Sequence, residues 1–151
     1  MAHQKSDQTP VSSTLGMITS MTPVLHPEPC VYATVSASAP QEKLLALLPL
    51  ARAIFNEGDD GMSILLPLAT AKAYPRLLTI IDPIMNHIEL KVYSSLEGIG
   101  LTAAVAQALT DAKIPCNVIA ALKHDHVYVP KEKAEAALQA LNDLVEEASR
   151  T

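Results

Sequence analysis

Two glycines, Gly98 and Gly100, lie two positions apart in a loop, residues 94–100, that joins a predicted strand to a predicted helix. The first N–H groups of a helix have no partner within the helix, and the helix dipole is positive at that end. A carboxylate or phosphate is therefore stabilised at such a junction without any catalytic side chain. The loop predicts a binding site for a small anion.

The same loop admits two other interpretations. Gly98, Gly100 and Ala103 match the G-x-G-x-x-A spacing of dinucleotide-binding loops. However, the preceding strand, residues 88–93, alternates apolar and polar side chains, whereas a central parallel strand is apolar on both faces. We therefore disfavour a nucleotide site. The other interpretation gives the glycines only the backbone freedom of a tight loop, without a ligand, and it stays as open as ligand binding.

Two polar side chains could hold the rest of a ligand. Asn117 offers both a donor and an acceptor to an amino-acid-like molecule. Glu97 could pair with its ammonium group, although a carboxylate also favours the start of a helix electrostatically.

His124 and His126 have the H-x-H spacing that would place both imidazoles on one side of a strand, as in a metal site. A third ligand is not evident, since His87 is distant and Asp125 would point the other way. We prefer a turn-capping Asp125 flanked by surface or interface histidines. We expect no metal, with these two histidines as the only candidate ligands.

A nucleophile and a calcium site are also disfavoured. Cys116, Asn117 and His124 could form an activated set, but strand alternation buries the thiol and no cation that would stabilise a thiolate is apparent. The acidic turn, residues 57–60, lacks the spacing of a calcium loop. We expect neither catalysis nor a cofactor.

The spacing of apolar residues predicts the elements that position these groups. The second half alternates at residues 88–92, continues into a helix with an apolar stripe, and returns through a hairpin to a final amphipathic helix. The apolar stripe of the first helix is Leu101, Val105, Ala108, Leu109 and Ala112. The inner face of the next strand is Cys116, Val118, Ala120 and Leu122. The apolar stripe of the last helix is Ala134, Ala137, Leu138, Leu141, Leu144, Val145 and Ala148.

The first half predicts the same order of elements. A short helix ends before Pro23, and a proline-rich connector follows at residues 24–29. The remaining predicted elements are a strand at 30–35, a helix at 42–48, a hairpin of residues 51–55 and 62–66, a helix at 67–74 and a strand at 77–81. We infer a tandem repeat in which the second half lacks an obvious last strand.

The composition excludes several classes of protein. The formal charge is -5 and no Lys/Arg run is present, so we expect neither nucleic-acid nor anionic-lipid binding. No apolar stretch reaches the length of a membrane span and no signal peptide is evident, which makes a cytoplasmic location the expectation. Cys30 and Cys116 have no metal-binding or redox spacing and are expected to be buried, reduced thiols.

Residues 94–105, 114–120 and 124–130 resemble the ACT-domain superfamily, and within it a stand-alone tandem group related to the CASTOR-type amino-acid sensors. The match is specific for residues 88–141, and residues 55–66 also resemble the hairpin of a first module. The resemblance implies an α+β fold of two ferredoxin-like (βαββαβ) ACT modules in tandem, with antiparallel sheets and helices on one face. It also implies a ligand at the seam of two modules, held by residues that here are Glu97, Gly98, Ile99, Gly100, Leu101, Asn117, Val118 and Ile119.

We therefore expect a flexible tail at residues 1–14, an N-terminal module with a preceding helix at 15–83 and a C-terminal module at 84–151. The expected function is non-enzymatic, regulatory binding of an amino acid or related carboxylate by a homodimer. The alternatives are an interaction module that uses open sheet edges without a ligand and a metal-dependent enzyme that uses His124 and His126.

Overall fold

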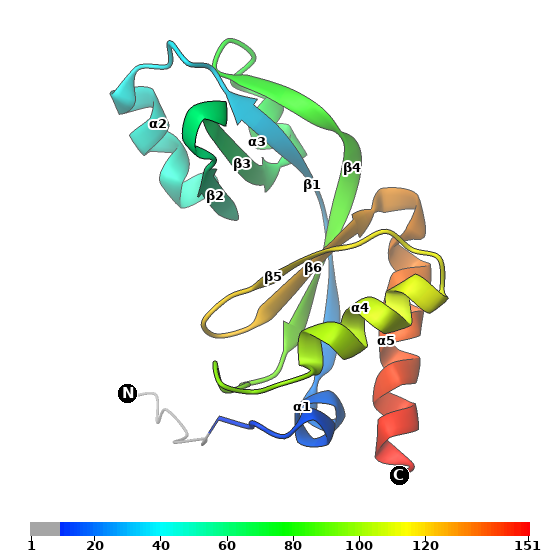
Figure 1. The fold of residues 1–151 in the computed structure, drawn as a ribbon. Helices are drawn as coiled ribbons and strands as arrows, with labels where there is room; N and C mark the ends of the chain where they lie inside the picture. The colour runs from blue at the N-terminus through cyan, green and yellow to red at the C-terminus, as the bar shows by residue number, and fades with distance from the viewer. Residues whose placement is uncertain (1–9) are drawn as a thin grey trace, which may run out of the picture. The chain divides into compact units, whose positions relative to one another are not determined.

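The structure is a computed structural model that describes residues 10–151 (Figure 1). These residues form two compact units, here called unit 1 and unit 2. Unit 1 contains residues 10–25, Ile88–Val129 and Lys133–Thr151, and unit 2 contains His26–His87 and Pro130–Glu132. The expected tail at residues 1–14 lies mostly outside the described residues. The units also divide the chain differently from the predicted domains 15–83 and 84–151, because the first described segment packs with the C-terminal one.

In the part that the structure describes, the chain combines five α-helices with six strands. The helices are α1 (Thr14–Ser20), α2 (Gln41–Leu47), α3 (Leu68–Lys72), α4 (Leu101–Asp111) and α5 (Ala134–Ser149), and the strands are β1 (Thr22–Val35), β2 (Ala53–Asn56), β3 (Met62–Pro67), β4 (Leu78–Lys91), β5 (Asn117–Ala120) and β6 (Asp125–Pro130). Single turns of 3-10 helix lie at η1 (Leu48–Leu50), η2 (Gly58–Asp60) and η3 (Lys131–Lys133). The predicted α+β class with an antiparallel sheet is confirmed.

The strands hydrogen-bond in the order β2-β3-β1-β4-β6-β5. In unit 2 this gives β2-β3-β1-β4, and in unit 1 it gives β1-β4-β6-β5, because β1 and β4 each contribute residues to both units. The strand that the second half lacked in sequence is therefore present in unit 1 as residues 22–25 of β1.

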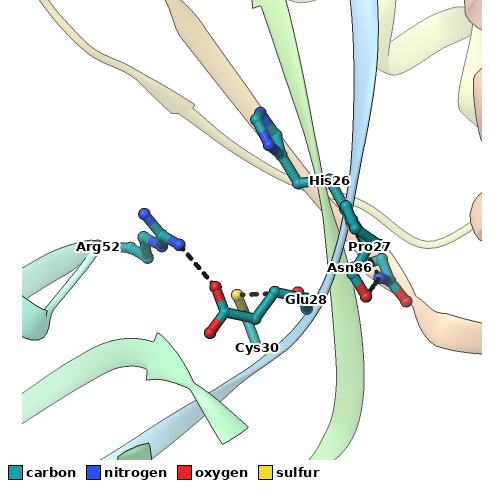
Figure 2. A network of polar contacts seen from close by, with 6 residues as sticks. All are labelled: His26, Pro27, Glu28, Cys30, Arg52 and Asn86. Carbon is teal, nitrogen blue, oxygen red and sulfur yellow. Dashed lines mark hydrogen bonds and ion pairs between the residues drawn. The ribbon is translucent and has the colours of Figure 1, made fainter.

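The proline-rich connector predicted at residues 24–29 is wrong, since these residues lie inside β1. The predicted strands 77–81 and 88–92 are likewise parts of one strand, β4. Proline fixes φ within the extended region but removes an N–H donor from the sheet. The buried Asn86 side chain of β4 adds a link to β1 in this stretch, since its Nδ2 donates hydrogen bonds to the carbonyls of His26 (3.1 Å) and Pro27 (3.3 Å) (Figure 2).

The core of unit 1 lies between one face of its strands and the helices α4 and α5, which lie side by side in Figure 1. Alternate residues of β4 and β6 and the predicted stripe of α5 share this core. The predicted stripe of α4 is right for Leu101, Val105 and Leu109, but Ala108 lies outside the core and Ala112, just past the end of the helix, is exposed. The best buried members of the core include Ile88, Leu90, Val105, Leu109, Val127, Val129, Ala137 and Leu141. The predicted inner face of β5 is only partly right, since Cys116 and Val118 touch the core but Ala120 and Leu122 are exposed. The last two lie where the strand ends in the hairpin turn.

Unit 2 contains the predicted hairpin of β2 and β3. Its acidic turn is a 3-10 turn at η2, closed by the Glu57 N–H, which donates to the Gly61 carbonyl at 2.8 Å. The core beneath α2 and α3 is aliphatic, with Val31, Leu47, Ile64 and Leu66 almost fully buried. Within residues 10–151, no helix is long and apolar enough to cross a membrane.

Candidate functional site

The glycine loop, residues 94–100, is a tight turn that delivers the chain from β4 to α4. The Gly98 N–H donates to the Ser95 carbonyl at 2.9 Å, and the Glu97 N–H donates to Ser95 Oγ at 3.1 Å. Gly100 then precedes α4 with φ at 102°, in the left-handed region that favours glycine. No side chain of the described residues caps α4 at Gly100. The first N–H groups of α4 therefore have no partner within the helix or from a capping side chain among residues 10–151, and they can donate to a ligand at this end.

The N-terminal segment of the chain covers part of this loop. A Cβ atom on Gly98 would lie 2.8 Å from Met17 Sδ, and one on Gly100 would lie 2.7 Å from Thr14 Oγ1. Both glycines are thus required by the close packing of α1, which the sequence alone did not reveal. This finding favours the structural interpretation of the glycines.

A pocket of about 210 Å³ lies beside the loop. Its walls are the glycine loop, the first two residues of α4, Met17 of α1, the end of β5 and Asp125 of β6. The positive pole of a helix of three turns and an aspartate thus line the same pocket.

Asp125 is only 6% exposed. Burial raises the pKa of its carboxyl group above the ordinary value, and the charges of His126 and then His124 oppose that shift. An acidic side chain that is both buried and inside a pocket with a helix N-terminus is a strong candidate for a ligand contact. In sequence it looked like a turn residue, because nothing in its neighbours signals that β6 begins there with an inward-facing position.

The predicted site residues are only partly brought together. Gly98, Gly100 and Leu101 line the pocket. Glu97 and Ile99 are exposed on the same loop, Ile99 by 80%. The other three predicted residues, Asn117, Val118 and Ile119, lie on β5 opposite Tyr128, Val127 and His126 and do not line this pocket.

The other residues of the pocket wall were not predicted from the sequence as site residues: Met17, Ser94, Ser95, Leu96, Thr102, Ala120, Ala121 and Asp125. The two serines belong to the predicted loop, residues 94–100, and Thr102 follows it closely, so their position is a usable signal. Met17 lies 81 positions before Gly98, and no local pattern connects them.

The two candidate metal ligands lie at the start of β6. His124 precedes the strand, and its Nδ1 lies 3.4 Å from the carbonyl oxygen of Val92. Among residues 10–151, no group of three or more His, Cys, Asp or Glu side chains could hold a metal ion.

Both cysteines are free thiols. Burial raises the pKa of the Cys116 thiol, which opposes its use as a nucleophile. Burial also raises the pKa of Cys30, which lies next to the exposed Arg52–Glu28 ion pair of 3.1 Å (Figure 2). Arg52 partly offsets this shift.

Comparisons with known proteins agree with this architecture. The ACT-domain family matches residues 86–143. A crystal structure of the Vibrio cholerae protein VC0802, a protein of unknown function named as a possible transport protein, is 34% identical in sequence, with a TM-score of 0.72. The match covers 87% of this chain and 94% of that one.

Two aspartate kinase structures share the fold at lower identity. The regulatory subunit from Thermus flavus is 15% identical with a TM-score of 0.60, and the match covers 83% of this chain and 98% of that one. The enzyme from Clostridium acetobutylicum is 14% identical with a TM-score of 0.60, and the match covers 83% of this chain but 34% of that one. No curated protein sequence matches the chain. The chain therefore contains an ACT domain at residues 86–143 and belongs to the same family as the Vibrio cholerae protein.

Proposed function

We propose that this protein is a non-enzymatic regulatory protein that binds a free amino acid, or a closely related carboxylate, in the pocket between the glycine loop and Asp125. The ligand carboxylate accepts hydrogen bonds from the first N–H groups of α4, and its ammonium group pairs with Asp125. A ligand that binds one state of the protein more tightly than another shifts the equilibrium toward that state, and this shift is the regulatory effect.

The observation that carries this proposal is the pairing of opposite charges in one small pocket. A purely anionic ligand at the start of α4 meets the carboxylate of Asp125, and a purely cationic one meets the positive helix end. A zwitterion satisfies both ends at once. A buried carboxylate that gains a cationic partner is also relieved of part of its desolvation cost.

We further propose that the two units are two ferredoxin-like ACT modules. In unit 2 the strands taken in order, β1, β2, β3 and β4, lie in the sheet order second, third, first, fourth. In unit 1 the strands β4, β5 and β6, with residues 22–25 of β1 taken last, lie in that same order. The repetition supports a first module at residues 26–87 inserted between the last strand and the remainder of a second module at residues 88–151.

Isothermal titration calorimetry on the full chain tests the binding proposal. The ligands are the standard amino acids, each compared with the matching acid that lacks the amine and the matching amine that lacks the acid. We expect only zwitterions to bind, and we expect Asp125→Asn to abolish the heat. Asp143→Asn, which changes an exposed aspartate on α5, is the matched control and should bind as wild type does. Absence of binding to the folded protein, or full affinity in Asp125→Asn, would refute the proposal.

The exposed apolar side chains of the same loop support a role in self-association. Leu96 is 77% exposed and Ile99 is 80% exposed. Neighbouring large apolar side chains at such exposure favour contact with another protein surface. We propose a homodimer as the assembly in which this loop is covered, and sedimentation velocity of wild type and Ile99→Ser tests it. A wild-type monomer at all concentrations would contradict the dimer, with or without a ligand.

A further inference from the structure

Met17 is the one side chain of α1 that reaches the pocket. It is 1% exposed and lines the pocket beside Gly98, where an added Cβ would lie 2.8 Å from its Sδ. It lies outside the segment that matches the ACT domain, residues 86–143. Apolar side chains of Leu96 and Leu101 and the small Ala120 and Ala121 form the other non-polar part of the wall.

Residues 11–14, here called the strap, fasten the N-terminus of α1 to the glycine loop. The Val11 N–H donates to the Tyr93 carbonyl at 2.9 Å, and the Ser95 N–H donates to the Val11 carbonyl at 2.8 Å. This places Val11 in a parallel bridge with Ser94. The Thr14 hydroxyl donates to the carbonyl of Ile99.

The strap and α1, which follows it in the chain, are held by different interactions. The strap residues are partly or fully exposed and are held by hydrogen bonds, whereas Met17, Ile18 and Met21 are buried in the core of unit 1. Seven residues are too few for a helix to be stable alone, so this burial fixes α1. Met17 is therefore anchored by the core, and the strap clamps the loop onto it.

We propose that Met17 is the specificity-determining residue of the pocket and that the strap keeps the glycine loop closed against it. This inference rests on the proposed binding of a zwitterion. The carboxylate and ammonium ends are fixed by α4 and Asp125, so the ligand side chain is left to meet Met17 and the apolar wall. The pocket then selects an aliphatic side chain by its length, and Met17 sets the limit.

Titration of wild type and Met17→Ala with alanine, 2-aminobutyrate, valine, leucine and methionine tests this inference. Met17→Ala enlarges the pocket and is expected to move the preference toward longer side chains by about tenfold per methylene. Gly98→Ala should move it the opposite way, because the added Cβ crowds Met17 Sδ in the pocket wall and leaves less room for the ligand. Met85→Ala, which removes a buried methionine from unit 2, is the matched control and should keep the wild-type order.

Two further variants keep the test decisive if Met17→Ala does not fold. Met17→Leu conserves volume but is stiffer and should sharpen the length limit without unfolding the core. Thr14→Val removes the hydroxyl that holds Ile99 and should raise the dissociation rate while leaving the order of preference unchanged. If wild type binds no amino acid, the proposed function itself fails. If wild type binds but the Met17 variants keep its order of preference, the role of Met17 is overturned while the binding function stands.

Discussion

Gly100→Ala should destabilise the protein through two separable effects. The residue has φ at 102°, and an alanine there costs about 1–2 kcal/mol in backbone strain. The new Cβ would also lie 2.7 Å from Thr14 Oγ1 and 2.8 Å from Thr14 Cγ2, closer than real Cβ atoms approach. Thr14 must then turn away and lose its hydrogen bond to Ile99, which adds about 1 kcal/mol.

The free energy of unfolding should therefore fall by about 2–3 kcal/mol, as measured by urea denaturation followed by circular dichroism. Gly58→Ala is the matched comparison, because Gly58 also has a positive φ, 64°, but nothing lies within 4 Å of an added Cβ. It should show the strain alone. Hydrogen exchange adds a local readout, since the Val11 amide bonded to Tyr93 should lose protection in Gly100→Ala only.

A double-mutant cycle refutes or supports the reasoning directly. Thr14→Ala in the wild-type background removes one hydrogen bond and should cost about 1 kcal/mol. In the Gly100→Ala background that bond is already lost, so the same change should cost almost nothing. Strictly additive effects would show that Thr14 and Gly100 do not meet as described.

Three further predictions concern other polar groups. Asp125→Asn should raise the free energy of unfolding at neutral pH. The pKa of Asp125 is raised in the folded protein, so ionisation of this carboxyl group lowers stability as the pH rises. In urea denaturation curves measured over a pH series, the extra stability of Asp125→Asn should vanish below the ordinary carboxyl pKa of 3.8. Asn86→Ala should cost about 1–3 kcal/mol in the same assay, because two β1 carbonyls lose their donor, and a loss below that range would show that water replaces the amide. Arg52→Ala should cost less than about 1 kcal/mol, because the side chains of Arg52 and Glu28 are 43% and 53% exposed, and a larger loss that persists in high salt would contradict a screened ion pair.

The parts of the fold that the sequence predicted are those in which local periodicity and burial agree. The stripe that begins at Leu101 and the alternation that begins at Ile88 each face one core, so each pattern carries one interpretation. The prolines of β1 led to the wrong prediction of a connector at residues 24–29, because the pairing of this segment with neighbouring strands is a tertiary interaction that local sequence does not report. Asn86, 59 positions from Pro27, supplies a donor that no local pattern anticipates.

The candidate site was predicted less well for the same reason. The glycine loop was found from its own residues, but its partners Met17 and Asp125 come from the N-terminal helix and from the start of β6. Neither has a motif around it. The burial of Asp125 depends on where the hairpin turn ends and β6 begins.

The structural and the binding roles of the two glycines can now be separated, because they depend on different partners. Packing of the strap and α1 explains why Gly98 and Gly100 lack side chains, and that explanation requires no ligand. It does not explain why a buried aspartate lines the same pocket of about 210 Å³ as the uncapped start of α4, since an unneeded buried charge costs stability. Gly100→Ala therefore tests the packing without a ligand, and Asp125→Asn tests the binding while leaving the strap intact. If Asp125→Asn is more stable than wild type but no longer binds the amino acid ligand, the carboxylate is retained for ligand binding.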